Sequence, residues 1–280
     1  MNGTGAATER QYQRFTRLNR ILHIFMVLSF LSLAVTGLTL KFSYTPFAAI
    51  VSHILGGFES AGYFHRYAAL IMIAVFLTHI VDVLRMKRRE HLSYMKLIFG
   101  PGSLMFNGND LRDLIASVKW FVGRGPRPAY GRWTYWEKFD YFAVFWGMFA
   151  IGGTGLMLWF PTLFTLVLPG WMLNVATIIH SDEALLAVGF IFTVHFFNTH
   201  LRPDKFPMDI VVFTGRMSVE ELRHDKSAEY DALVRSGTLE QYLVEPYQPI
   251  VIKAIRFFAW AALALGVSII VWIVYAMLLS

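Results

Sequence analysis

The sequence predicts an all-α protein, an integral membrane bundle of five transmembrane helices. Three observations support this prediction. The chain has 280 residues, of which 56% are hydrophobic and only 16% are charged, and its mean hydropathy is +0.49. A soluble domain of this size needs more charge on its surface. The apolar residues also occur in blocks of about twenty, the length that an α-helix needs to cross roughly 30 Å of hydrocarbon. Because backbone polar groups cannot stay unpaired in lipid, these blocks are expected to be helices and not strands.

The five apolar segments lie at about 20–41, 63–84, 138–160, 173–199 and 251–279. The first segment follows a polar and basic start, MNGTGAATERQYQRFTRLNR. It is too long for a cleaved signal peptide and no small-residue cleavage site follows it, so we interpret it as a permanent helix. The first four segments are separated by turns containing Gly or Pro or by charged loops, and each can span the membrane with modest tilt.

Two long loops carry most of the polar sequence. The 85–138 loop contains RMKRRE, the Gly/Pro-punctuated run GPGSLMFNGND and the amphipathic stretch DLRDLIASVKWF. The 200–256 loop contains a polar helical run, SVEELRHDKSAEYDALVRSG. Two interpretations stay open for these loops: a surface on which another subunit sits, or a solvated loop.

Nearly all basic residues fall on one side of the predicted bundle. Of the 25 Lys and Arg residues, only Lys41 and Arg66 lie in or beside the connection between helices one and two, and the connection between helices three and four has none. By the positive-inside rule, the N-terminus and the two long loops are cytoplasmic, and five spans place the C-terminus in the periplasm. We therefore predict a multi-pass protein of the bacterial inner (cytoplasmic) membrane.

The net charge of +6 needs no nucleic acid to explain it. The basic excess lies where anionic lipid headgroups and the insertion rule favour it, so we expect membrane lipid and not nucleic acid as a partner. Cysteine is absent, which excludes disulfides, thiolate-bound iron–sulfur clusters and c-type haem attachment. Metal chemistry would rest on histidine, carboxylate or methionine. The sequence has no HExxH spacing and no clustered histidine box of the kind that di-metal membrane oxygenases use.

Histidines are placed where polar side chains are costly. Of nine histidines, six lie inside or at the edge of the predicted helices, and we expect the other three, in or near loops, to be ordinary surface residues. An imidazole in the hydrocarbon suggests function, although a single one is as readily explained by a hydrogen bond between helices. The membrane histidines are His23, His65, His79, His180, His195 and His200; the loop histidines are His53, His91 and His224.

The spacing of these histidines adds information. His180 and His195 are fifteen residues apart, about 60° out of phase and roughly 22 Å apart along a helix axis. His65 and His79 are fourteen apart, about 40° out of phase and roughly 21 Å apart. Each of the two helices thus offers an outer and an inner imidazole on about the same face. That layout suits two haems with two histidine ligands each, because axial ligands come from facing helices at matched depth.

The two predicted levels are not equally determined. His65 and His180 match at the outer level, whereas His23, His79 and His195 all compete at the inner level, which is one ligand too many. Small residues would give a flat macrocycle room between helices, and four glycines could do so: Gly37, Gly152, Gly153 and Gly155. Glycine also promotes close packing of membrane helices, and both readings stay open.

Several motifs resemble a known family. TRLNRILHIFMVLSFLSLAVTGLTLKF resembles the first helix of the cytochrome b (gamma) subunits of membrane-bound formate dehydrogenases. TGLMLWFP and PGWMLNVATIIHSDEALLAVGFIFTVH resemble their third helix, outer turn and fourth helix, and VVFTGRMSVEELRHDKSAEYDAL resembles the polar tail that follows. The likeness covers about 20–225 and is shared in large part by cytochrome b subunits of nickel–iron hydrogenases and thiosulfate reductases.

The resemblance implies two haem b groups, an outer one ligated by His65 and His180 and an inner one ligated by His23 and His195. It also implies a quinone, menaquinone or ubiquinone, near the inner haem, with Asn198 and His200 as candidate pocket residues or, on the plainer reading, interfacial anchors.

Four of the five helices would then form the haem-binding core. The predicted domains are 1–240, a di-haem cytochrome b membrane domain with cytoplasmic loops, and 241–280, an additional C-terminal transmembrane helix.

Two features depart from the family pattern. The gamma subunits have four spans, so the fifth helix here puts the partner complex in doubt. His79 has no counterpart in the pattern. It replaces His23 as inner ligand, serves a third haem with His200, or hydrogen-bonds a propionate or a quinone, and these roles stay open.

The expected function is electron transfer between a periplasmic redox partner and the membrane quinone pool, as a subunit of a quinone-linked oxidoreductase. The expected partners are other subunits of a respiratory complex, an iron–sulfur or c-type cytochrome subunit among them. The alternative is a histidine-lined proton channel or transporter subunit without haem, in which the imidazoles relay protons. A purely structural anchor would not require two histidine levels.

Overall fold

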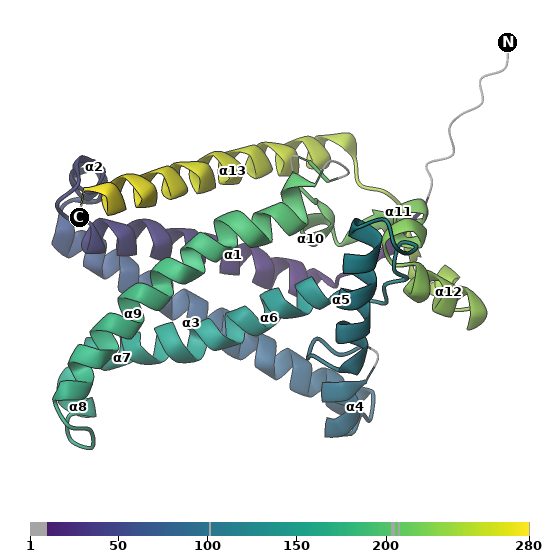
Figure 1. Ribbon diagram of the computed structural model, residues 1–280, viewed down its shortest axis with the longest axis horizontal. Coiled ribbons are helices and arrows are strands. Elements are labelled where there is room, and N and C mark those ends of the chain that lie inside the picture. The colour runs from purple at the N-terminus through teal and green to yellow at the C-terminus, as the bar shows by residue number, and fades with distance from the viewer. Residues whose placement is uncertain (1–9, 101, 203–204, 207, 280) are drawn as a thin grey trace, which may run out of the picture. The chain divides into compact units, whose positions relative to one another are not determined.

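The computed structural model describes residues 10–100, 102–202, 205–206 and 208–279 (Figure 1). The chain is 76% helical with almost no sheet, which confirms the predicted all-α fold. Within the described residues, five helices are long and apolar enough to cross a membrane, as predicted, and the chain is a multi-pass membrane protein. These spans are Arg17–Lys41, Phe58–Arg89, Tyr135–Trp159, Trp171–Leu201 and Pro249–Leu278.

Three of the spans are single α-helices: α1 (Arg17–Lys41), α3 (Phe58–Arg89) and α13 (Pro249–Leu278). The third span consists of α6 (Tyr135–Gly147), the π-helix η1 (Met148–Gly152) and α7 (Gly153–Trp159). The fourth consists of α9 (Trp171–Phe190) and the π-helices η2 (Ile191–His195) and η3 (Phe197–Leu201). The shorter helices are α2 (Pro46–Leu55), α4 (Tyr94–Phe99), α5 (Gly108–Phe121), α8 (Pro161–Phe164), α10 (Val211–Thr214), α11 (Val219–Asp225), α12 (Ser227–Arg235) and the 3-10 helix η4 (Leu239–Tyr242).

The helix α3 extends beyond both predicted ends, 63 and 84. Its last turn contains Lys87, Arg88 and Arg89, whose positive charges interact favourably with the negative end of the helix dipole. A prediction based on apolarity alone stops where these charged residues begin, although the backbone continues as a helix.

The chain divides into two compact units, which are described one at a time. The span unit contains 22–80, 143–209 and 257–280, and the loop unit contains 1–21, 81–142 and 210–256. Each unit thus combines segments that are distant in sequence. The predicted division at residue 240 concerns cofactor binding and stays a prediction.

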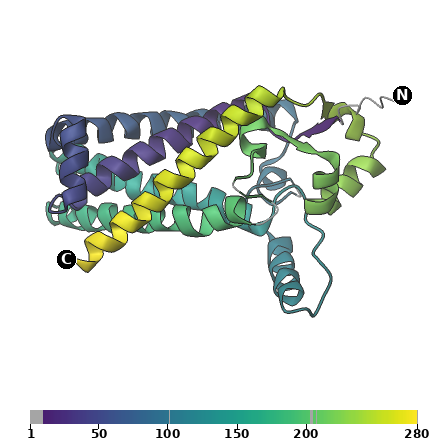
Figure 2. The same cartoon turned by 90° about the horizontal axis from the view of Figure 1, so that it is seen from above.

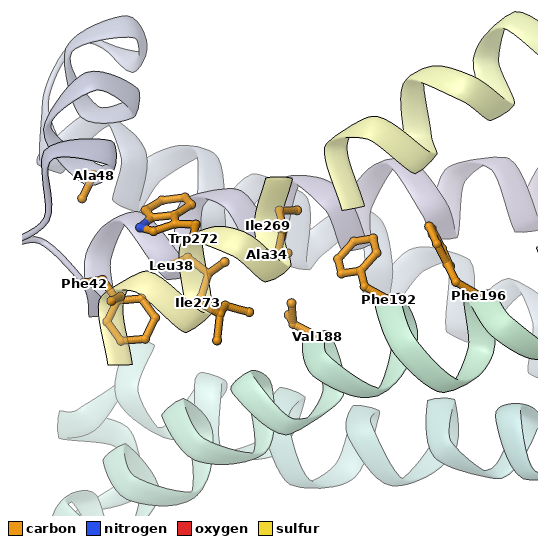
Figure 3. Close-up of a cluster of buried hydrophobic side chains, with 11 residues drawn as sticks. Ala34, Leu38, Phe42, Ala48, Val188, Phe192, Phe196, Ile269, Trp272 and Ile273 are labelled. Atoms are coloured by element: carbon orange, nitrogen blue, oxygen red, sulfur yellow. The ribbon is translucent and has the colours of Figure 1, made fainter. Parts of the chain in front are cut away.

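In the span unit, α13 packs along α1 and the fourth span (Figures 1 and 2). Figure 3 shows the buried cluster that joins them, with Leu38 from α1, Phe192 from η2 and Ile269 from α13 among its members. Lipid tails are as apolar as these side chains, so close packing and not exclusion from water holds such helices together. At one end of α13, Trp272 Nε1 donates a hydrogen bond to Thr45 Oγ1 over 3.2 Å. Thr45 is also the N-cap of α2, so its side chain connects α13 to the start of α2.

The loop unit has its own small core and a three-stranded antiparallel sheet that the sequence analysis did not anticipate. The strand order is β2 (Arg216–Ser218), β1 (Gln11–Gln13), β3 (Leu243–Val244), with Tyr12 opposite Met217 and Leu243. β1 is drawn as a short purple arrow in Figure 2. Each strand is too short to show a period of two in the sequence.

Partly buried ion pairs join segments of this unit. Glu137 accepts hydrogen bonds from Arg14 over 2.9 Å and from Lys226, and these residues come from segments distant in sequence. Arg132 donates to Glu229 over 3.0 Å, and Tyr12 OH donates to the same carboxylate over 2.8 Å. Removing Arg14 or Lys226, whose side chains are buried, would leave the Glu137 carboxylate without one of its charged partners, which is destabilising.

Candidate functional site

The span unit brings two of the predicted ligands together. His65 lies in α3 and His180 in α9, both half-buried, and their ring centroids are 6.2 Å apart with an interplanar angle of 79°. We call these residues the first histidine pair. Their juxtaposition agrees with the matched depth inferred from the spacing of histidines along two separate helices.

Hydrogen bonds orient both rings through the same nitrogen. Thr36 Oγ1 donates to the carbonyl oxygen of Ser32 over 2.6 Å and therefore accepts from His65 Nδ1, which is 2.9 Å away. His180 Nδ1 donates to the carbonyl oxygen of Ile151 over 2.9 Å. A neutral imidazole with its proton on Nδ1 keeps a lone pair on Nε2. Both rings thus present Nε2 as the nitrogen that can bind a metal, with Nδ1 held in the way typical of metal-ligating histidines.

Two of the predicted glycines lie directly against these rings. A Cβ added to Gly37 would lie 3.3 Å from His65 Cε1, and one added to Gly155 would lie 2.9 Å from His180 Cε1. The second distance is too short for two carbon atoms without a shift of the ring. At both positions it is a histidine side chain, and not a neighbouring helix backbone, that approaches the glycine, and the approach is closer at Gly155.

The fourth span changes from α to π geometry where it carries its other histidines. η2 ends at His195 and η3 contains His200. Hydrogen bonds in a π-helix join residues five apart, so such residues lie on nearly the same face, whereas in an α-helix they are about 140° apart. The rings of His195 and His200 accordingly stand 5.7 Å apart between centroids, at 89°.

His23 of α1 belongs to the same group. Its imidazole is near enough to those of His195 and His200 for their protonated forms to repel one another. We call His23, His195 and His200 the second histidine cluster. His200 is buried, and its Nδ1 accepts a hydrogen bond from the Asp209 N–H over 3.3 Å, so its ring proton lies on Nε2. This tautomer is the opposite of that in the first pair, and it leaves His200 Nε2–H as a donor.

Aromatic side chains connect the second histidine cluster to α13. The ring of Phe196 lies 5.2 Å from that of His200 and 5.1 Å from that of Phe192, between centroids. Gly266 of α13 allows this contact, since a Cβ there would lie 2.5 Å from Phe192 Cδ1 and 3.0 Å from Phe196 Cε2. Sequence reasoning missed these residues, and the only signal for them was the single glycine of the apolar helix α13.

Other predicted residues are not part of these contacts. His79 is half-buried in α3 and Asn198 is half-buried in η3. A Cβ on Gly153 would meet no atom within 4 Å, and one on Gly152 would meet only the Met148 methyl group, at 3.9 Å. The loop histidines are exposed, as expected: His53, His91 and His224.

In the described part of the chain, no three or more His, Asp or Glu side chains form a cluster suited to holding a metal ion. Two facing histidines are nevertheless the complete protein ligand set of a six-coordinate haem iron. His65 and His180 would supply these two ligands through their Nε2 atoms. The observed 6.2 Å, the shared Nδ1 orientation and the glycine at each ring fit this group.

Comparison with known proteins adds no family. No protein-family model matches the sequence, and no curated protein matches it.

Proposed function

We propose that the chain is a membrane di-haem b-type cytochrome, which transfers electrons between a periplasmic redox partner and the membrane quinone pool. The observation that carries the proposal is the first histidine pair, with its two rings at 6.2 Å and both Nδ1 atoms held by hydrogen bonds. If the two histidines only packed helices together, there would be no reason for both rings to use Nδ1 in a hydrogen bond and leave Nε2 for a ligand.

In this proposal His65 and His180 hold one haem b, and His23 and His195 hold the other. When bound, haem supplies one-electron redox chemistry, while the protein fixes ligation and orientation. Thr36 and the Ile151 carbonyl hold the two Nδ1 atoms, so Nε2 of each ring would be available to the iron, and Gly37 and Gly155 leave room for the rings.

The quinone, menaquinone or ubiquinone, binds beside the second histidine cluster. His200 Nε2–H is suited to donate a hydrogen bond to a quinone carbonyl, and Asn198 follows His195 in the same span. Lys205 forms an ion pair with Asp209 over 3.4 Å, and the Asp209 N–H donates to His200 Nδ1, so polar groups continue from His200 into the following segment. His79 stays a competitor of His23 for the inner iron.

The location follows from the same assignment. We place the chain in the bacterial inner membrane with the N-terminus and both long loops in the cytoplasm, because nearly all Lys and Arg residues lie there. The first histidine pair is then near the periplasmic surface. The chain acts as the electron-transfer subunit of a quinone-linked respiratory complex with an iron–sulfur or c-type cytochrome subunit, similar to the gamma subunits of membrane-bound formate dehydrogenases.

The test is a pyridine haemochrome spectrum of the purified full-length protein, with haem quantified per chain. A ratio near two is expected, and about half of it should remain in His65→Ala and in His180→Ala, since each variant loses one axial ligand of the same haem. His53→Ala is the matched control, because His53 is exposed and should keep the full ratio. A protein without any protohaem signal contradicts the proposal and supports the proton channel.

The second haem needs a separate comparison. His23→Ala, His79→Ala and His195→Ala are each expected to leave the first haem intact. If loss of the second haem follows His79→Ala and not His23→Ala, the inner ligand assignment is wrong. A ratio near three in the unaltered protein would instead bring His79 and His200 into ligation.

A further inference from the structure

In the loop unit, the amphipathic helix α5 exposes its apolar face and buries polar side chains. Two of its polar side chains are turned toward the protein: Asp110 and Ser117 are buried, and Ser117 Oγ lies 2.7 Å from Tyr130 OH. Asp110 forms an ion pair with Lys138 at 2.8 Å, and both side chains are less than a tenth exposed. Asp110 and Ser117 are thus committed to interactions inside the unit.

The apolar face of α5 is exposed. Leu111 is 61% exposed and Phe121 73%, and the intervening apolar residues recur at the helical spacing of three and four. At 100° per residue these side chains occupy an arc of about 120°. The exposed apolar residues are Leu111, Leu114, Ile115, Val118, Phe121 and Val122. We call this surface the α5 apolar face. Contiguous exposed apolar surface of this kind marks an interaction site.

Basic residues border the α5 apolar face on one side. Arg112 and Lys119 are exposed and are seven residues apart, so they lie on the same side of the helix. At 100° per residue, both lie just beyond one edge of the apolar face. Trp120 is also exposed, next to Phe121. Long basic side chains beside a stripe of Leu, Ile, Val and Phe are typical of helices that lie in a membrane interface, where the charged ends reach the phosphate groups.

The connectivity and the contacts of α5 place its N-terminus beside the start of a span. It lies in the connection between two spans, α3 and the third span, so both ends of the connection return to the same membrane surface. Its first turn is bound to the first turn of the third span by the Asp110–Lys138 ion pair. The preceding residue Phe106 contacts Phe142 of the same span, with ring centroids 6.2 Å apart. The N-terminus of α5 is therefore fixed beside the first turns of the third span.

We propose that α5 is an interfacial membrane-binding helix, whose apolar face inserts into the lipid headgroup region of a bilayer that contains anionic lipid. Arg112 and Lys119 bind lipid phosphates at its border. This role is independent of haem, and it assigns to the 85–138 loop a lipid surface as its partner.

The test uses the absence of native cysteine. Leu114→Cys and Val118→Cys place a nitroxide label on the α5 apolar face of the full-length protein, and Arg235→Cys places one on an exposed polar position of the same unit. The proteins are reconstituted in vesicles of phosphatidylethanolamine and phosphatidylglycerol. Accessibility of each label to apolar oxygen and to a water-soluble nickel chelate then reports its depth.

Labels at 114 and 118 are expected to gain oxygen accessibility and lose nickel accessibility relative to the label at 235. Equal nickel accessibility at all three positions overturns the proposal. Loss of both accessibilities at 114 and 118 also overturns it, because it would mean that a second copy of the chain covers the face.

A second arm tests the charges. Arg112→Gln together with Lys119→Gln, in the Val118→Cys protein, is expected to shift the label toward water in anionic vesicles and to have no such effect in purely zwitterionic vesicles. An unchanged label depth in anionic vesicles would overturn the anionic-lipid part of the proposal.

Discussion

Gly153 and Gly155 are two residues apart in one span and differ in what an added methyl group would meet. At Gly155 the methyl carbon would lie 2.9 Å from His180 Cε1, whereas at Gly153 it would meet nothing within 4 Å. We expect Gly155→Ala to displace the His180 ring and to lower the haem content per chain toward the value of His180→Ala. Gly153→Ala should keep the full content. Haem content is measured by pyridine haemochrome. Equal content in the two variants would show that the His180 ring does not depend on the absence of a side chain at Gly155.

The phenol group of Tyr12 predicts a measurable dependence of stability on pH. Burial, followed by the negative charge of Glu229, raises the pKa of Tyr12 from 10.0 to about 12. Above pH 10 an unfolded chain ionises this tyrosine while the folded chain keeps it protonated, so stability contributed by Tyr12 is lost as the pH rises from 10 toward 12. Amide exchange of residues 11–13 should therefore accelerate in this range. Tyr12→Phe should show a weaker pH dependence there, and an unchanged dependence would contradict the assignment.

At the scale of elements, α13 is held by its contact with the fourth span at Gly266. Gly266→Ala would place a methyl carbon 2.5 Å from Phe192 Cδ1, and overpacking of this kind costs about 1–3 kcal/mol. We expect a lower midpoint of thermal unfolding in detergent and a disturbed second histidine cluster, since Phe192 and Phe196 lie between Gly266 and His200. Ser268→Ala, at an exposed position of the same helix, is the control and should unfold as the unaltered protein does.

The elements also show which features a sequence can predict. The five spans follow from apolarity and length, and the first histidine pair follows from residue spacing because α3 and α9 are regular α-helices at His65 and His180. The contact between His195 and His200 does not follow, because α-helical geometry places residues five apart on different faces. Only the two π-helices bring these rings together. Nothing in the sequence marks a π-helix, whose hydrogen bonds depend on tertiary packing.

At the scale of the whole molecule, the direction of insertion is open to a direct test. Thr165→Cys lies between the third and fourth spans and Arg235→Cys lies in the loop unit, and both positions are exposed. In intact cells, a membrane-impermeant maleimide should label the first variant, whereas the second should be labelled only after the membrane is opened. The physical reason is the basic excess of the long loops, which is retained in the cytoplasm. The reverse labelling pattern would invert the proposed positions of the two histidine groups.

The sheet of the loop unit marks the limit of prediction for the molecule as a whole. Its strands pair residues 11–13 with 216–218 and with 243–244, and each strand has only two or three residues. A hydrophobic pattern needs more residues than this to reveal a strand, and local sequence does not specify a pairing partner 200 residues away. The pairs of Glu137 with Arg14 and Lys226 were likewise unpredictable. Charged residues are rarely buried unless they are paired, and only the fold shows which residues are partners.

The central position of β1 has a consequence for how the protein is made. Gln11–Gln13 leaves the ribosome before any span, yet its partner strands are Arg216–Ser218 and Leu243–Val244. At a synthesis rate of about 5–20 residues per second, the first residues wait roughly 10–40 s for them. Four of the five spans have been synthesised by then. The sheet therefore closes late in biogenesis, and a chain truncated before residue 243 leaves the N-terminal segment without a strand on one edge.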